Sequence, residues 1–135
     1  MRLCLIEKKK YMKRLLICLL TVLLANNSFA QKEQIGYIES DRNWHHVYDP
    51  QGKKLRGFSR SSVGDVVGWG TDFFVGKQGG FYRIFDAKGK VLKALSVNTV
   101  GEVLSVSGET ITSRLGNWIY FWDKNGKKLG TRPAR

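Results

Sequence analysis

The feature that most constrains the fold of this chain is a repeat of 37 residues. Asp49, Asp86 and Asp123 are equally spaced, and Gly, Lys and Leu columns follow each Asp at the same distances without a gap. Self-similarity at a fixed period of this length indicates an array of equal structural units. We therefore expect units at about residues 31–60, 61–97 and 98–135.

Each unit is rich in strand-forming residues. Segments 81–85 and 118–122 combine aromatic and β-branched side chains, which suit pleated strands. No window after Ala30 has the apolar period of an amphipathic helix. The first unit should lack one strand of four, because the expected strands lie near residues 35–39, 44–49, 53–58, 64–69, 72–77, 81–86, 90–96, 101–106, 109–114, 117–122 and 127–132.

The repeated columns divide into turn residues and aromatic residues. Asp accepts hydrogen bonds from amides ahead of it, and Gly tolerates a positive φ, so both suit hairpin turns. The turn residues are Asp49, Gly52, Asp86, Gly89, Asp123 and Gly126. The aromatic columns, which we expect to fill the core, are Trp44, Tyr48, Phe81, Phe85, Trp118 and Trp122.

The pattern Tyr/Phe-x-x-Phe-Asp-x-x-Gly-Lys-x-Leu, complete at residues 82–92, resembles the blades of PQQ-like and WD40-like β-propellers. It departs from them in having no Trp after Leu55, Leu92 or Leu129. The resemblance implies an architecture and brings no catalytic residue. The strand at 119–122 is apolar on both faces, which stacked sheets would cover. We expect an all-β fold of antiparallel four-stranded repeats, with about three propeller-like blades; the alternative is a meander β-barrel.

Three blades would leave two open ends. Propellers close with ~4–8 blades, and exposed edges and apolar faces invite pairing. Two chains forming a six-bladed homo-oligomeric ring would close them, as would a self-contained barrel or stack. The hairpins suit each of these arrangements.

The first thirty residues have the layout of a secretory signal peptide. Five basic residues between Lys8 and Arg14 precede the apolar run 15–25, and Ser28 and Ala30 end it with small residues two apart. The run is shorter than the ~20 residues of a membrane anchor. Cleavage after Ala30 would export a single domain, residues 31–135, to the periplasm or the extracellular space; Met12 is a possible true start. Both cysteines, Cys4 and Cys18, lie in the leader.

No arrangement of residues points to catalysis or to a metal or cofactor. His45 and His46 are adjacent on an expected strand, so they point to opposite faces and would not ligate one metal. Ser59, Ser61 and Ser62 lack the glycines of a nucleophile elbow. We expect a protein that is not an enzyme.

Charge gives the remaining candidate for a site. The chain has 23 Lys+Arg and 11 Asp+Glu, a net charge of +12; residues 31–135 hold 17 and 10 of these, a net charge of +7. A lysine rim would recur in every unit, and an anionic glycan or lipopolysaccharide would bind it in a salt-dependent way. We favour edge protection as the reason for these lysines, because they are spread among acidic residues. The rim residues are Lys53, Lys54, Arg56, Lys88, Lys90, Lys93, Lys127 and Lys128.

The leading hypothesis for function is an exported, non-enzymatic β-repeat module that binds a protein partner or itself. The first alternative is a polyanion or envelope-glycan binder that uses the lysine rim. Nucleic acid is disfavoured, because its platforms need exposed aromatics between the cations. The second alternative is a small hydrolase or an enzyme inhibitor.

Overall fold

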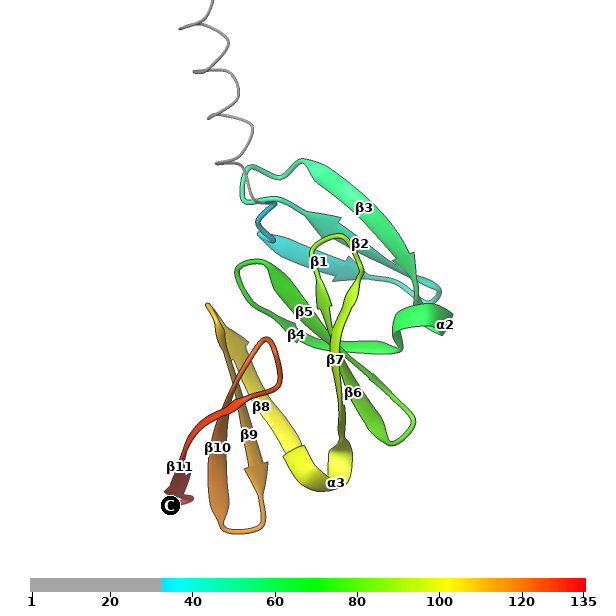
Figure 1. Cartoon of the computed structure of the whole chain (residues 1–135). Helices are drawn as coiled ribbons and strands as arrows, with labels where there is room; N and C mark the ends of the chain where they lie inside the picture. The colour runs from blue at the N-terminus through cyan, green and yellow to red at the C-terminus, as the bar shows by residue number, and fades with distance from the viewer. Residues whose placement is uncertain (1–32) are drawn as a thin grey trace, which may run out of the picture. The chain divides into compact units, whose positions relative to one another are not determined.

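Short strands in three antiparallel sheets make up most of the described chain (Figure 1). The computed structural model describes residues 33–135, of which 60% are in strands and 8% in helices. The all-β class is confirmed. None of these sheets is closed, so the alternative of a single meander barrel is wrong. The predicted leader, residues 1–30, lies outside the described residues.

Each sheet is a meander whose strands pair in chain order. Sheet A contains β1 (Tyr37–Ser40), β2 (Trp44–Tyr48) and β3 (Lys54–Ser59). Sheet B contains β4 (Asp65–Trp69), β5 (Phe73–Gln78), β6 (Phe81–Asp86) and β7 (Val91–Ser96). Sheet C contains β8 (Glu102–Ser107), β9 (Thr110–Leu115), β10 (Trp118–Asp123) and β11 (Lys128–Pro133). Within residues 33–135, sheet A has three strands where the others have four, as the repeat predicts.

The hairpin turns after β2, β6 and β10 repeat the same hydrogen bonds. Asp49 Oδ1 accepts from the amides of Gln51 at 3.0 Å and Lys53 at 2.8 Å. Asp86 and Asp123 accept in the same way from residues two and four places ahead. The turn glycines have φ of +85°, +88° and +78°, which favours a residue without a Cβ. Equal backbone settings at equal spacing show that the repeat is structural.

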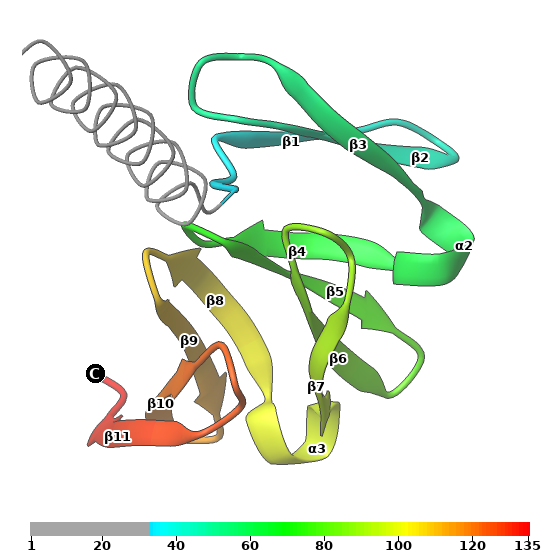
Figure 2. The same ribbon diagram turned by 45° about the horizontal axis from the view of Figure 1, so that its top comes forward.

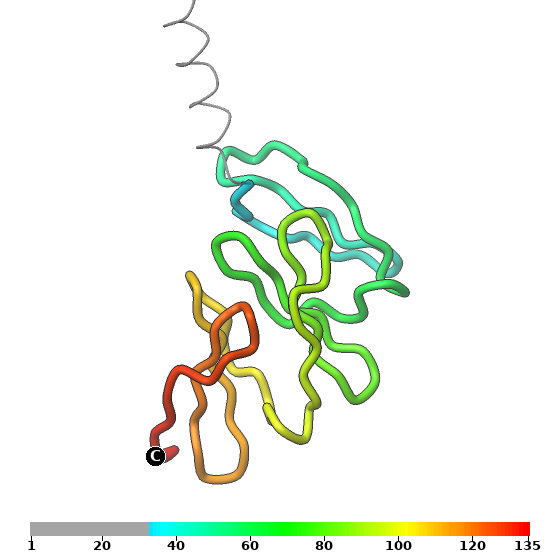
Figure 3. The backbone as a smooth tube through the Cα atoms, in the orientation of Figure 1, coloured from blue at the N-terminus to red at the C-terminus, as the bar shows by residue number. Residues whose placement is uncertain are grey.

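Two one-turn helices link the sheets, and no sequence pattern predicted them. They are α2 (Arg60–Val63) and α3 (Val97–Val100), and Ser59 and Ser96 cap their N-termini. Four residues are too few to show a helical period, so our expectation of no helix after Ala30 was wrong at these links. Gly64 and Gly101 end the helices with φ of +82°, and the tube in Figure 3 shows the chain turning into the next sheet at each link.

Sheet B lies between sheets A and C (Figure 2), and an apolar cluster fills the space on each of its sides. In the first, Ile38 and Val47 of sheet A pack with Phe74 and Phe85 of sheet B. In the second, the other face of sheet B packs with sheet C; its buried members are Phe73, Val75, Tyr82, Ile84, Val100, Ile111 and Trp122. Sheet B is therefore covered on both faces, which explains why its strands β5 and β6 lack a simple alternation of apolar and polar residues.

One side chain of β2 and one of β6 each donate a hydrogen bond to the backbone of the unit that follows. His45 Nε2 donates to the carbonyl oxygen of Gly64 at 2.7 Å, and the Tyr82 hydroxyl donates to that of Gly101 at 2.9 Å. Both donors and both acceptors are 37 residues apart. The His45 Nδ1 atom lies 2.6 Å from the Ser40 hydroxyl oxygen, so both ring nitrogens have a partner. Ile119 occupies the third equivalent position.

Candidate binding surface

The outer face of sheet A carries three aromatic rings. Tyr37 pairs with Tyr48 across β1 and β2, and Glu39 pairs with His46, so the four side chains share a face. Trp44 lies on the same face, two residues before His46. Tyr37 is 54% exposed and Trp44 is 50% exposed. No strand or helix of residues 33–135 lies over this face (Figure 2). At its edge, the Tyr37 ring packs edge-on against Trp69 of sheet B, with ring centroids 5.6 Å apart.

The equivalent faces of the other two sheets are covered. Thirty-seven residues after Tyr37 and Tyr48 stand Phe74 and Phe85, which are 0% and 4% exposed beneath sheet A. The third copies, Ile111 and Trp122, are buried against sheet B. The outer face of sheet A thus has the residue types that receive another sheet elsewhere in the chain.

Asp41 holds the hairpin that presents Trp44. Its Oδ1 accepts from the amides of Asn43 at 2.9 Å and Trp44 at 2.7 Å, and its Oδ2 lies 3.1 Å from His46 Nε2. The Asn43 amide, with the His46 ring and the Trp44 amide, lowers the pKa of Asp41 from 3.8 to about 2. This carboxylate is therefore charged at any ordinary pH, and it orders the end of the face.

Two open hollows lie beside the rings. One of about 570 Å³ is lined by Tyr37, Glu39, Tyr48 and Pro50 among others. The other, of about 440 Å³, lies at the opposite end of β2 beside Trp44 and Arg60. The surface is therefore uneven, with aromatic rings between shallow depressions, and a partner could fill both hollows while it contacts the rings.

The free face of sheet C mixes polar residues with apolar ones, among them Ile119 and the 56% exposed Leu129. Thr110 and Thr112 stand where sheet B has the buried Phe73 and Val75. Phe121, at the position of Ile84, is only half-buried. The two ends of the stack are therefore chemically different.

The aromatic columns do not all enter the core. Phe85 and Trp122 are buried at 4% and 6% exposure, but Trp44, Phe81 and Trp118 are about half exposed. We expected all of these in the core. The three exposed residues begin the central strands beside the hairpin turns, beyond the area where the sheets overlap. The remaining member, Tyr48, is half-buried because its side of sheet A is uncovered. Tyr37 was not among the predicted core or site residues, although its column, with Phe74 and Ile111, is apolar throughout.

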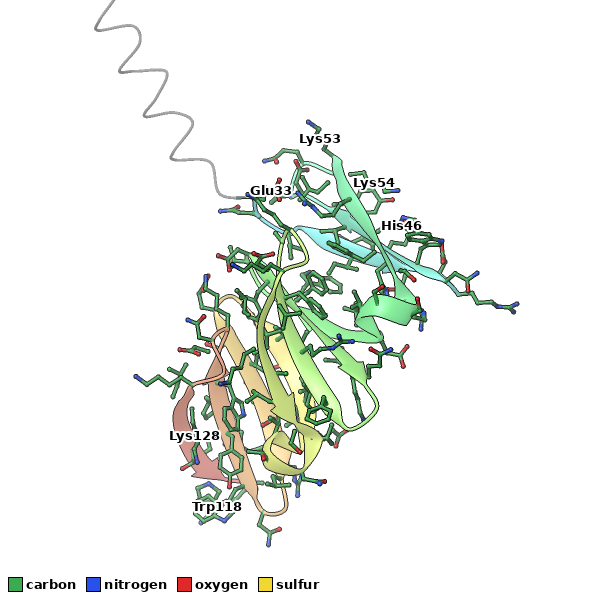
Figure 4. All side chains as sticks on the ribbon, turned by 45° about the vertical axis from the view of Figure 1, so that its right-hand side comes forward. Glu33, His46, Lys53, Lys54, Trp118 and Lys128 are labelled. Carbon is green, nitrogen blue, oxygen red and sulfur yellow. The ribbon has the colours of Figure 1, made fainter. Side chains whose placement is uncertain are left out.

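The rim cations fall into two groups. Arg56 bonds to Glu33 at 2.6 Å, and the Lys128 Nζ lies 4.9 Å from the centre of the Tyr120 ring. The others are exposed, and none forms an ion pair with the described residues; they are Lys53, Lys54, Lys88, Lys90, Lys93 and Lys127. Figure 4 shows Lys53 and Lys54 at one end of the described unit and Lys128 toward the other. The backbone turns hold Lys53, Lys90 and Lys127 in equivalent places.

The histidines lie on opposite faces of β2, His45 in the core and His46 on the outer face. In the part of the chain that the structure describes, no group of three or more His, Cys, Asp and Glu side chains could hold a metal. Likewise, none of the helices between residues 33 and 135 has the length and apolar character needed to cross a membrane.

Comparison with protein-family models, with curated proteins and with solved structures finds no match for this chain. The likeness to propeller blades stays a prediction from the sequence pattern. Function must therefore be argued from the surfaces themselves, and the uncovered aromatic face of sheet A is the most distinctive of them.

Proposed function

We propose that this chain is an exported module that works by binding a protein through the outer face of sheet A. One observation carries the proposal. Among the described residues no sheet covers Tyr48, and Tyr37 stays 54% exposed beside its edge contact with Trp69, whereas Phe74, Phe85, Ile111 and Trp122 at the equivalent positions are buried. Exposed aromatic groups that are rimmed by polar residues mark interaction surfaces. Aromatic residues are also enriched at the centres of protein interfaces.

Photo-crosslinking in the cells that make the protein tests this surface. The chain offers matched positions, because Trp44, Phe81 and Trp118 occupy one column and are 50%, 56% and 48% exposed. Only Trp44 lies on the uncovered face. A photoreactive phenylalanine analogue at position 44 should yield a protein adduct, and the same analogue at 81 or 118 should not. Equal adducts at the three positions, or none at 44, would refute the proposal.

Export is the other half of the proposal, and it rests on the leader. The basic segment, the apolar run 15–25 and the small residues Ser28 and Ala30 support cleavage after Ala30. N-terminal sequencing of the protein purified from its cells should give Gln31 as the first residue. A chain that keeps its leader in the cell would contradict export without touching the binding surface.

The exposed rim lysines favour a second candidate function, the binding of an anionic glycan or lipopolysaccharide. Six rim cations form no ion pair with the described residues, and three of them repeat at turn positions. The triple variant Lys53→Glu, Lys90→Glu and Lys127→Glu should elute from a heparin column at lower salt than the wild type. A triple variant of Lys77, Arg83 and Arg114 to Glu, with the same change in charge, is the control. Equal elution of the two variants would argue against a lysine site.

A further inference from the structure

The two ends of the sheet stack differ in a way that selects a partner for the binding face. At the sheet C end, Thr110 and Thr112 replace large apolar residues, and Ile119 stands where His45 and Tyr82 bind the next unit. At the sheet A end, Tyr37 and Tyr48 keep the type of residue that another sheet covers. Arrays of repeats need a polar terminal unit for solubility. The sheet C end has this character in part, because Thr110 and Thr112 lie beside Ile119, Phe121 and Leu129, whereas the sheet A end presents three aromatic rings.

We propose that the outer face of sheet A binds the same face of a second copy of this chain, which gives a two-fold symmetric dimer. This inference rests on the proposed function, because it names the partner of that surface. Two-fold contacts are the commonest in homo-oligomers, and they bring one patch against itself. The dimer would join the two aromatic ends and leave both sheet C ends outward. A head-to-tail ring would instead place the aromatic face on the Thr-containing face.

The charges of this face suit such self-pairing. Glu39 lies on β1, and Lys54 lies on β3 opposite Tyr48, so both project from the outer face. Both side chains are exposed, and neither forms an ion pair with the described residues. A two-fold axis along β2 lays β1 of one copy over β3 of the other. Glu39 of each copy then lies near Lys54 of its partner.

The area of the face limits the strength of the dimer. Three strands about 4.8 Å apart, with five residues at about 3.4 Å each, give a plan area of roughly 240 Å². A stable interface buries about 800 Å² on each partner. We therefore expect a reversible dimer with a dissociation constant of about 10–1000 µM rather than an obligate one.

Sedimentation analysis of the protein, produced from the full-length sequence, tests this from about 5 µM to 1 mM. The average mass should rise with concentration and level off at two copies. Glu39→Lys should raise the dissociation constant at least ~10-fold, and Glu39→Lys with Lys54→Glu should restore it. Thr112→Lys, on the free face of sheet C, should leave the dimer unchanged. Circular dichroism of each variant confirms that it is folded.

Three outcomes would overturn the dimer. A monomer at 1 mM would exclude it, a mass that grows beyond two copies would indicate head-to-tail association, and loss of association in Thr112→Lys would place sheet C in the contact. None of these three outcomes contradicts the proposed function. A crosslink from position 44 to a different protein, together with a monomer in solution, would remove the self-pairing and keep the binding surface.

Discussion

The hydroxyl group of Tyr82 joins the second unit to the third, and its removal should have a measurable cost. Tyr82 is 4% exposed; it donates to the buried Gly101 carbonyl at 2.9 Å and lies 3.4 Å from the Val103 amide. A hydrogen bond contributes about 0.5–1.5 kcal/mol, and a buried acceptor left without a donor costs about 1–3 kcal/mol. Tyr82→Phe keeps the ring packing, so we expect the free energy of unfolding to fall by about 1–2 kcal/mol.

Urea denaturation followed by tryptophan fluorescence measures this loss. In thermal unfolding, the melting temperature should fall by roughly 4–8 °C for each kcal/mol lost in a domain of this size. Tyr120→Phe is the matched control, because the Tyr120 hydroxyl has no hydrogen bond to the described residues and its ring is half-buried. The control should change stability by less than about 0.5 kcal/mol. If the two variants lose equal stability, the hydroxyl does not couple the units.

Three further predictions concern single positions. Gly101→Ala should lower the free energy of unfolding by more than about 3 kcal/mol, because its Cβ would clash with the Arg114 carbonyl oxygen at a φ of +82°. Gly79→Ala, at a φ of +60° with open space around it, should lower it by about 1 kcal/mol. Chemical denaturation compares the two variants. The lowered pKa of Asp41 means that its carboxylate stabilises the fold above pH 3.8, and this contribution should be lost as the pH falls through about 2. Asp41→Asn should lack this acid-dependent loss of stability. The NMR chemical shift of the Asp41 carboxyl carbon reports its titration. The hydrogen bond that Lys124 donates to Asp72 raises the pKa of Lys124 above 10.5. Its contribution to stability should be complete below pH 10.5 and lost as the pH rises through the folded value, and urea titrations at pH 9–12 should show no such loss in Lys124→Met.

The strands were predicted well from the sequence because the repeat presents the same strand pattern three times. The strands expected near 53–58, 90–96 and 127–132, for example, begin and end within one residue of β3, β7 and β11. The turn residues were equally clear, since Asp and Gly at fixed spacing have a direct backbone reason. The links at Arg60–Val63 and Val97–Val100 were missed because one helical turn leaves no period.

The candidate surface could not be predicted from the repeat alone. A column shows that residues are equivalent in the unit, but burial also depends on whether a neighbouring sheet exists on that side. Tyr48 and Phe85 share a column, yet Phe85 is 4% exposed and Tyr48 is only half-buried. Similarly, Trp44 and Trp118 were assigned to the core as aromatics, although their place beside the turns leaves them in solvent. The repeated cation columns predicted where the rim cations lie but not which of them bind a carboxylate, as Arg56 does with Glu33.

The joints between units have one further consequence. The amides of Arg60, Val97 and Ala134, each directly after the last strand of its sheet, donate to the carbonyls of Asn43, Gly80 and Asn117 of the same unit at 2.8–2.9 Å. The chain therefore leaves each sheet in the same backbone setting. A tandem duplication of residues 61–97 would meet a matching joint on both sides, so such an array can be lengthened by a whole sheet while both of its ends keep their chemistry.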